Sequence, residues 1–310
     1  MTVIAYLFPG QNSHFIGMGR ELYEAGGPAK LVFEVAESAL GAELLSVMFE
    51  GPEDDLTRTE NQQPAIMTHS LAALSALRET ALTPDYVAGH SLGEYSAVTC
   101  AGCLGLEEAL ELVSFRGNLM ARAGDEAPGS MAAVLGLDAE EVATVVEEAG
   151  EVGTIVVANY NSPGQVIISG EEGALERAGI LAEEAGAKRV IALDVSGAFH
   201  SPLMASAVGP LTERLEQTEF APASPPVLSN VDARPHTDPA EICDCLVEQM
   251  TSSVLWEQSV RWMVEQGVDT FVEIGPGRVL SGLVRRVDRS LVAHTVSTPA
   301  DVESVAAELA

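Results

Sequence analysis

Basic residues are scarce in this sequence. The chain of 310 residues has 16 lysines and arginines against 46 aspartates and glutamates, which gives a formal net charge of −30. Lysine occurs only as Lys30 and Lys188. A chain this acidic is repelled by nucleic-acid phosphates and by anionic lipid headgroups. The composition therefore argues against nucleic acid and membrane surfaces as partners.

Two explanations of this acidity are open. In a high-salt cytoplasm, screening shortens the reach of self-repulsion to ~3 Å at 1 M salt, so an acidic surface is tolerated. A GC-rich genome would by itself favour arginine over lysine. Activity measured from low to multimolar KCl separates the two, because an optimum at low salt contradicts the salt hypothesis.

Long apolar runs are missing as well. No stretch reaches the ~18 apolar residues that a membrane helix needs, and the apolar segment before Pro9 and Gly10 is too short for a signal peptide. Hydrophobic residues nevertheless make up 47% of the chain, enough to bury the core of one large domain. We expect a globular protein of the cytoplasm.

Cysteines are few, and they occur in two pairs. The C-x-x-C pattern of Cys100 and Cys103 could be half of a zinc site or a redox pair. The spacing of Cys243 and Cys245 does not supply the other half, and reduced cysteine is a common buried residue. We expect no metal and no cofactor.

The order of expected elements indicates an α/β fold. Residues 130–193 read as strand, helix, strand, strand, helix, strand, the ferredoxin-like unit. Glycine-rich segments flank this unit, which suggests an insertion. We therefore predict a large α/β subdomain (1–124 and 197–310) and an inserted ferredoxin-like small subdomain (125–196).

Gly89-His90-Ser91-Leu92-Gly93 matches the G-x-S-x-G pattern of a nucleophile elbow. A short apolar segment, 86–89, precedes it as a predicted strand, and residues 92–101 follow as a predicted helix. This context places Ser91 at the N-terminal end of a helix, where backbone N–H groups are free. The alternative is a glycine-rich structural turn without chemistry.

A serine hydroxyl is a weak nucleophile and needs a base within hydrogen-bonding reach. His200 is the best candidate among the six histidines, because it lies in a loop at the predicted junction of the subdomains. His90 is adjacent to Ser91 in sequence, so its side chain is expected to leave the turn in another direction.

Several ordered motifs resemble those of the malonyl-CoA:acyl-carrier-protein transacylase family, and they span nearly the whole chain. They are Phe8-Pro9-Gly10-Gln11, Gln63-Pro64-Ala65, Gly89-His90-Ser91-Leu92-Gly93-Glu94-Tyr95, Arg116-Gly117, Asn159-Tyr160-Asn161-Ser162-Pro163-Gly164-Gln165, Phe199-His200-Ser201 and Glu273-Ile274-Gly275-Pro276-Gly277.

The resemblance implies a hydrolase-like large subdomain with a parallel sheet, which agrees with the predicted α/β fold. It also implies a serine acyltransferase that moves a malonyl group from malonyl-CoA to acyl carrier protein. Ser91 would be the nucleophile and His200 its base. The resemblance also gives roles to other residues. They are Leu92 and Gln11 at the oxyanion, Arg116 on the malonyl carboxylate, Phe199 in selecting malonyl over bulkier groups, Gln249 in orienting the histidine, and Asn159 and Asn161 in fixing a loop near the cleft.

The first loop departs from the family pattern. It reads Gly10-Gln11-Asn12-Ser13-His14 where Gly-Gln-Gly-Ser-Gln is usual. Asn12 must then take the backbone angle that a glycine otherwise takes, and asparagine tolerates positive φ better than most residues.

Acyl carrier proteins are themselves acidic, so docking requires a local basic patch on this chain. Arg285, Arg286 and Arg289 form its densest basic cluster. The alternative is a solvated helix end whose arginines interact with the helix dipole.

Two other functions are weighed against the transacylase. An esterase or thioesterase would need an acid before His200 and an HGGG-type loop; that loop is missing, and Asp194 is the only acid shortly before the histidine. A non-catalytic docking module for carrier proteins would have no reason to keep Ser91, His200 and Arg116 together.

Overall fold

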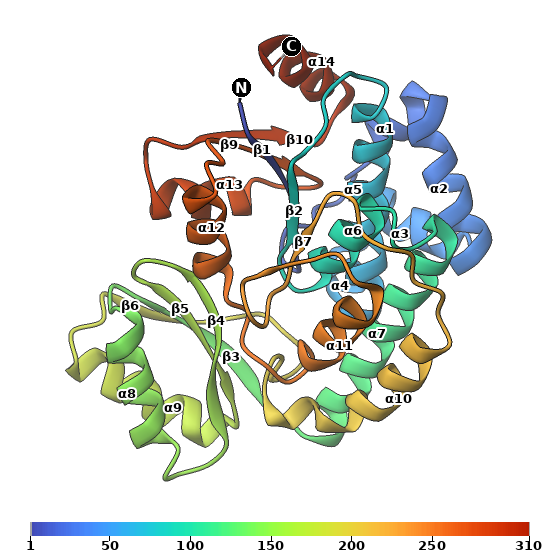
Figure 1. The fold of residues 1–310 in the computed structure, drawn as a ribbon. Coiled ribbons are helices and arrows are strands. Elements are labelled where there is room, and N and C mark those ends of the chain that lie inside the picture. The colour runs from blue at the N-terminus through green and yellow to red at the C-terminus, as the bar shows by residue number, and fades with distance from the viewer. Residues whose placement is uncertain (1, 310) are drawn as a thin grey trace.

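A largely parallel sheet forms the centre of the larger part of the chain in this computed structural model, which describes residues 2–309 (Figure 1). Its order is β10–β9–β1–β2–β7–β8, and all neighbours run parallel except β7 and β8. The strands are β1 (Ile4–Phe8), β2 (Tyr86–Gly89), β7 (Val227–Leu228), β8 (Pro235–His236), β9 (Thr270–Ile274) and β10 (Val292–Val296).

The helices of the large subdomain lie on both sides of the small subdomain in the sequence. Those before it are α1 (Arg20–Ala25), α2 (Gly27–Leu40), α3 (Glu43–Glu50), α4 (Glu53–Thr57), α5 (Thr59–Leu77), α6 (Leu92–Cys100) and α7 (Leu106–Glu126). Those after it are the 3-10 turn η1 (Pro202–Met204), α10 (Ala205–Glu216), α11 (Pro239–Glu248), α12 (Trp256–Glu265), α13 (Val279–Val287) and α14 (Pro299–Leu309).

Both faces of the sheet are covered, as β1 illustrates. Alternate residues of a strand point to opposite faces. Ile4, Tyr6 and Phe8 belong to a core shared with α2, α5 and α7, whereas Ala5 and Leu7 belong to a second core shared with α12 and α13. Every residue of β1 is buried, and its sequence is accordingly a continuous apolar run. This pattern is expected for a strand of a parallel sheet between helical layers.

A separate antiparallel sheet has the order β4–β5–β3–β6. Its elements follow one another as β3 (Ser130–Leu135), α8 (Ala139–Ala149), β4 (Ile155–Ser162), β5 (Gln165–Gly170), α9 (Glu172–Glu184) and β6 (Arg189–Ala192). This is the ferredoxin-like arrangement predicted from the sequence, and the predicted fold class is confirmed.

The two faces of this small sheet have different neighbours. Ala132 and Val134 of β3 pack in a core with residues of α8 and α9. Met131 and Ala133, the alternate residues, line a cavity on the opposite face. The small sheet therefore presents one face to its own helices and the other to the site described below.

The chain enters and leaves the small subdomain at one place. A Cβ atom at Gly124 would lie 2.4 Å from the carbonyl oxygen of Ser196, so the two passes run in backbone contact. The limits 125–196 of the small subdomain stay a prediction.

Asn159 and Asn161, which were expected to fix a loop near the cleft, both lie in β4, which continues to Ser162. The tight turn at Pro163 and Gly164 allows β4 to pair with β5 up to Gln165, with irregular register after Val157. The two asparagines are thus held by a sheet.

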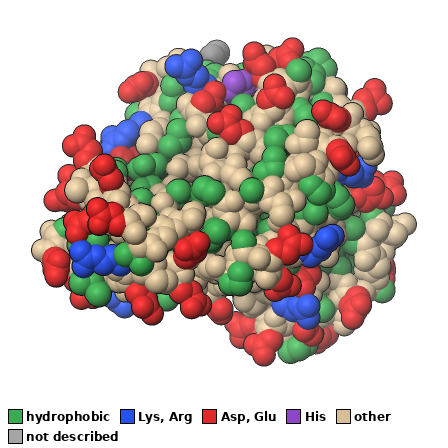
Figure 2. All heavy atoms as spheres, turned by 90° about the horizontal axis from the view of Figure 1, so that it is seen from below, with side chains coloured by type: hydrophobic (Ala, Val, Ile, Leu, Met, Phe, Trp, Pro, Cys, Tyr) green, Lys and Arg blue, Asp and Glu red, His purple; other side chains and the backbone are tan. Residues whose placement is uncertain are grey.

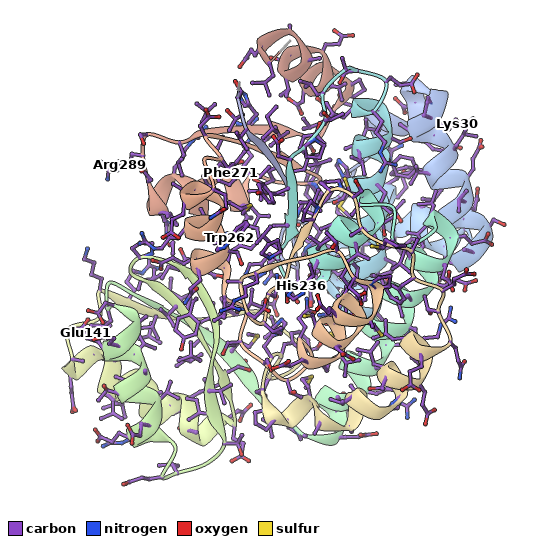
Figure 3. The ribbon with its side chains drawn as sticks, viewed as in Figure 1. Lys30, Glu141, His236, Trp262, Phe271 and Arg289 are labelled. Atoms are coloured by element: carbon purple, nitrogen blue, oxygen red, sulfur yellow. The ribbon has the colours of Figure 1, made fainter. Side chains whose placement is uncertain are left out.

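The surface is as acidic as the composition requires. Carboxylates surround the face seen from below, with few basic groups between them (Figure 2). Lys30 and Arg289 lie at opposite outer edges of the ribbon, while Phe271 lies inside it (Figure 3). Among residues 2–309, no helix combines the length and apolar character needed to cross a membrane.

Candidate active site

Ser91 sits on the sharp turn between β2 and α6, with a positive φ of 52°. The turn is possible because its flanking residues have no side chains. A Cβ atom at Gly89 would lie 1.8 Å from the carbonyl carbon of Gly93, and one at Gly93 would lie 2.0 Å from the carbonyl oxygen of Phe8. A non-glycine residue held at positive φ costs of order 1–3 kcal/mol, and such strain is typical of functional sites.

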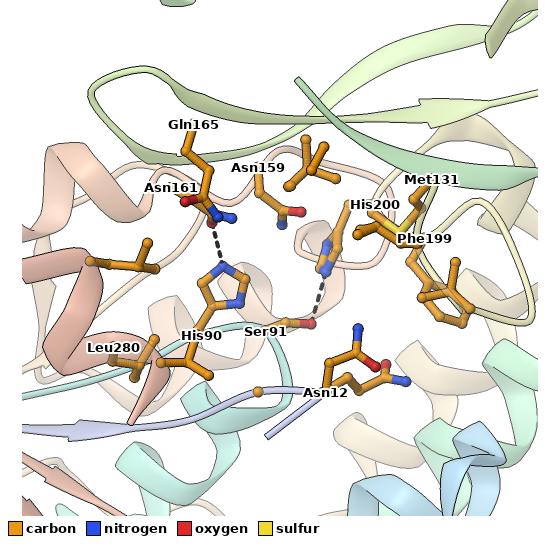
Figure 4. A pocket seen from close by; sticks show the side chains of 18 residues that line it. Asn12, His90, Ser91, Met131, Asn159, Asn161, Gln165, Phe199, His200 and Leu280 are labelled. Atoms are coloured by element: carbon orange, nitrogen blue, oxygen red, sulfur yellow. Dashed lines mark hydrogen bonds between the residues drawn. The ribbon is translucent and has the colours of Figure 1, made fainter. Parts of the chain in front are cut away.

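His200 reaches Ser91 from a distant part of the chain. Its Nε2 atom lies 2.8 Å from the Ser91 hydroxyl oxygen (Figure 4), and its Nδ1 atom lies 2.9 Å from the backbone carbonyl oxygen of Gln249. A carbonyl oxygen can only accept a hydrogen bond, so Nδ1 carries the ring proton and donates the hydrogen bond to Gln249. Nε2 is then free to accept the proton of Ser91.

The surroundings of His200 keep its imidazole neutral. Burial, reinforced by the nearby positive charge of Arg116, lowers the pKa of His200 to about 3. The hydrogen bond to Gln249 opposes both effects but is weaker. The neutral form is the one that can act as a base.

Arg116 is fully buried beside Ser91. Its guanidinium donates to the Ser91 hydroxyl oxygen at 3.1 Å, to Gln249 Oε1 at 2.9 Å and to Gln63 Oε1 at 2.6 Å. The face of Tyr95 lies 5.3 Å away, measured from the ring centroid to Cζ. A surface role for this arginine is excluded, and its charge is directed at Ser91.

Leu92 and Gln11 lie where an oxyanion could be held. Leu92 is the first residue of α6, so no preceding helical turn accepts its N–H. Gln11 lines the cavity, but its side-chain amide is engaged with Thr59 and Gln63, which leaves the backbone N–H as its candidate donor. Asn12 has a φ of 67°, which confirms that it takes the angle of a glycine.

Comparisons with known proteins agree with this geometry. The acyl transferase domain family matches residues 5–306. A malonyl CoA-acyl carrier protein transacylase of Bacillus subtilis is 48% identical over 98% of this chain and 96% of its own length. The chain belongs to this transacylase family. A solved acyl-carrier-protein-S-malonyltransferase of Bartonella henselae matches with a TM-score of 0.96 and 41% identity over 99% of each chain.

A second solved member of the transacylase family is a malonyl-transacylase in complex with a type II PKS acyl-carrier protein. It matches with a TM-score of 0.96 and 39% identity, over 99% of this chain and 100% of its own.

In this member of the transacylase family, Ser91 and His200 open onto a cavity of about 210 Å³ between the subdomains. The first loop, the elbow and α13 form one side, and β3, β4 and β5 of the small sheet form the other. Phe199 lines the cavity beside His200 (Figure 4). Both subdomains are therefore needed to enclose a bound acyl group.

Sequence reasoning missed Asn230 altogether. Its side-chain oxygen accepts from the Ser91 N–H at 2.7 Å, and its amide nitrogen donates to the carbonyl oxygen of Gly89 at 2.7 Å. Asn230 thus holds the turn through hydrogen bonds to both Gly89 and Ser91. It lies 139 residues from Ser91, in a segment with no local pattern that could have revealed it.

His90 links the elbow to the small subdomain. Its Nε2–H donates to Asn161 Oδ1 at 2.8 Å, and its ring packs near that of Trp256. Burial lowers the pKa of His90, so the ring is neutral. As predicted, its side chain leaves the turn in another direction from that of Ser91, which bonds His200.

One group of potential metal ligands lies outside this site. Asp232, His236 and Cys245 place one ligand atom each within 4.8 Å of one another. His236 already has a carboxylate on each ring nitrogen, Asp232 at 2.9 Å and Glu241 at 3.0 Å. Ion pairing accounts for this cluster without a metal.

Proposed function

We propose that this chain transfers the malonyl group of malonyl-CoA to the phosphopantetheine thiol of acyl carrier protein, for the synthesis of fatty acids or polyketides. The acyl group is carried between the two thiols as an ester of Ser91. The observation that carries this proposal is the convergence of His200 and Arg116 on the same Ser91 hydroxyl, at 2.8 and 3.1 Å.

In the first half-reaction, the Ser91 oxygen attacks the thioester carbonyl while His200 Nε2 takes its proton. The Gln249 carbonyl stabilises the resulting imidazolium through Nδ1–H. The backbone N–H groups of Leu92 and Gln11 stabilise the oxyanion, each donor contributing on the order of 3 kcal/mol. The C–S bond then breaks, and the CoA sulfur leaves with the proton from His200.

The second half-reaction reverses these steps with a different thiol. The phosphopantetheine thiol gives its proton to His200 and attacks the malonyl ester, and Ser91 departs with that proton. The acid–base chemistry is complete with Ser91 and His200, so the proposed reaction uses no metal and no cofactor. We assign it to the cytoplasm, as expected from the sequence.

Substrate choice is assigned to Arg116 and Phe199. A guanidinium matches a carboxylate with paired N–H donors, and the malonyl carboxylate can replace the Ser91 hydroxyl as the partner of Arg116. Phe199 lines the cavity next to His200, and we assign to its ring the preference for malonyl over a branched acyl group. Phe199→Ala is expected to raise the relative rate with methylmalonyl-CoA.

Mass spectrometry after mixing with malonyl-CoA tests the proposal. A malonyl adduct on Ser91 is expected, followed by its transfer to a purified carrier protein with parallel double-reciprocal kinetics. Ser91→Ala should form no adduct. Hydrolysis without transfer would indicate an esterase instead, and the absence of any adduct with the unmodified protein would indicate a docking module.

A further inference from the structure

Glu94 is an acid that the proposed reaction leaves unused. It lies in the first turn of α6, three residues after Ser91, and the residue is 2% exposed. Charged groups are rarely this buried unless they are paired. Its position next to the elbow therefore requires an explanation.

A single amide connects Glu94 to Arg116. Gln249 Oε1 accepts from Arg116 at 2.9 Å, and Gln249 Nε2 donates to Glu94 Oε2 at 2.6 Å. The cation requires an acceptor and the carboxylate requires a donor, so the two charges together allow only one orientation of the amide. The backbone carbonyl of the same Gln249 holds His200 Nδ1.

The groups around Glu94 come from three other elements. Arg116 on α7 is the positive one. The segment between β7 and β8 contributes the Asn230 N–H, which donates to Glu94 Oε2 at 3.2 Å, and the negative charge of Asp232. From α11 and its C-terminal end come Cys245 and Gln249, and Tyr95 is the neighbour on α6 itself.

Burial dominates in this setting. It raises the pKa of Glu94 to about 7, against the opposing effects of Gln249, Asn230 and Arg116. The carboxylate is thus balanced between its two protonation states near neutral pH. A further negative charge brought to Arg116 shifts that balance toward the protonated form.

We propose that Glu94 is a positioning residue that fixes the Gln249 amide, and that it takes up a proton from solvent when a malonyl carboxylate binds Arg116. This inference rests on the proposed function, because the second anion is the carboxylate of the substrate. In the free protein the buried charges of Arg116 and Glu94 balance. With malonyl bound there are two anions and one cation, and protonation of Glu94 restores the balance.

The coupling has a definite sign. Above the pKa of free Glu94, about 7, malonyl loading must be accompanied by proton uptake, so loading weakens as the pH rises. For one coupled proton, kcat/KM for malonyl-CoA falls by up to about tenfold per pH unit. Acetyl-CoA releases the same thiol but brings no carboxylate, so the proton exchange measured with it is the background.

Two variants separate the positioning role from the proton. Both hydrogen bonds to Glu94 end on Oε2, so the amide oxygen of Glu94→Gln can accept both while the charge and the titration are lost. Glu94→Ala removes the acceptor, frees the Gln249 amide and should slow acylation by malonyl-CoA and acetyl-CoA alike.

The experiment measures Ser91 acylation from pH 6 to 9, together with proton uptake in weakly buffered indicator dye, normalised to the adduct found by mass spectrometry. Unmodified protein is expected to take up more protons with malonyl-CoA than with acetyl-CoA. Glu94→Gln is expected to lose both this excess and the decline of malonyl loading above pH 7.

Equal proton uptake with the two thioesters overturns the proposal, even if Glu94→Gln does not fold. An adduct that forms normally without excess uptake rejects only the role of Glu94, whereas the absence of any adduct rejects the proposed function.

Discussion

Arg116 Nη2 donates a hydrogen bond of 3.1 Å to the hydroxyl oxygen of Ser91. The same oxygen lies 2.8 Å from His200 Nε2, so the hydroxyl is held between an imidazole nitrogen and a guanidinium. The cation also helps to keep His200 neutral. In the proposed reaction, Arg116 would therefore influence the base and bind the substrate carboxylate at once.

Arg116→Ala should lower kcat/KM for malonyl-CoA and thereby raise the rate with acetyl-CoA relative to that with malonyl-CoA. Loss of a charge-assisted pair in a buried site costs ~3 kcal/mol, which corresponds to roughly a hundredfold in kcat/KM. Acetyl has no carboxylate to leave unpaired. The ratio of kcat/KM for the two thioesters is the measurement.

Arg116→Lys is the matched control for this change. It keeps the charge but lacks the paired donors, so it should recover only part of the malonyl rate. Equal losses with malonyl-CoA and acetyl-CoA in Arg116→Ala would identify Arg116 as a structural residue that only holds Gln63 and Gln249.

Asn230→Ala should lower kcat and stability together. The change leaves the Ser91 N–H and the Gly89 carbonyl without their partner, and an unsatisfied buried group costs about 1–3 kcal/mol. The free energy of unfolding from urea titration gives the loss of stability. Asn230→Asp keeps the acceptor for Ser91 but turns a second acceptor toward Gly89, so wild-type stability in that variant would contradict the assigned contacts.

Acid should destabilise the protein through its buried histidines. Burial lowers the pKa of His69 to about 4 and that of His200 to about 3, both below the unfolded value of 6.5. The unfolded chain then binds more protons at these two groups, so their contribution to stability is full above pH 6.5 and is lost as the pH falls toward 4, at about 1 kcal/mol per pH unit and group. The raised pKa of Glu94 acts in the opposite sense and offsets part of this loss between pH 7 and 4.5. The melting temperature between pH 7 and 4 measures this.

His69→Gln is the control for the acid effect, because His69 lies outside the active site and bonds the Ser297 carbonyl oxygen, which glutamine can also reach. In this variant, the slope of the free energy of unfolding against pH should correspond to one bound proton fewer. An unchanged slope would show that His69 does not titrate on unfolding.

Arg286→Glu should raise the KM for carrier protein and leave malonyl-CoA self-acylation unchanged. Within the basic cluster, Arg285 bonds the Ala293 carbonyl, and Arg286 bonds Gln165 at the edge of the cavity. A reversed charge there repels an acidic carrier. Arg177→Glu on α9, on the outer side of the small sheet, is the matched control, and equal effects of both changes would exclude a specific docking patch.

The sequence was sufficient for the parts of the fold with strong local patterns. The buried strand β1, the elbow turn and the alternation of the small subdomain each follow from residues close together in the chain. The short strands β7 and β8 have two residues each, too few for any periodic signal.

The candidate site divides in the same way. Motifs identified Ser91 and His200 as partners, and the structure brings them within hydrogen-bonding distance. Asn230 and the amide bridge from Arg116 to Glu94 could not be predicted, because each contact joins residues more than a hundred positions apart and depends on side-chain direction. Family resemblance named Gln249, but only the structure distinguishes its carbonyl, bound to His200, from its amide.

The interlocked glycines of the elbow limit how this protein can evolve. At Gly89 and Gly93 the atoms that would meet a new side chain belong to the backbone of neighbouring segments, Phe8 among them. A second mutation cannot remove backbone atoms. No suppressor mutation elsewhere in the chain can therefore make room for even an alanine at either position. In a saturation library these two sites should be invariant under selection for activity, and adaptation to new acyl groups must proceed through the cavity wall, where obstacles are side chains.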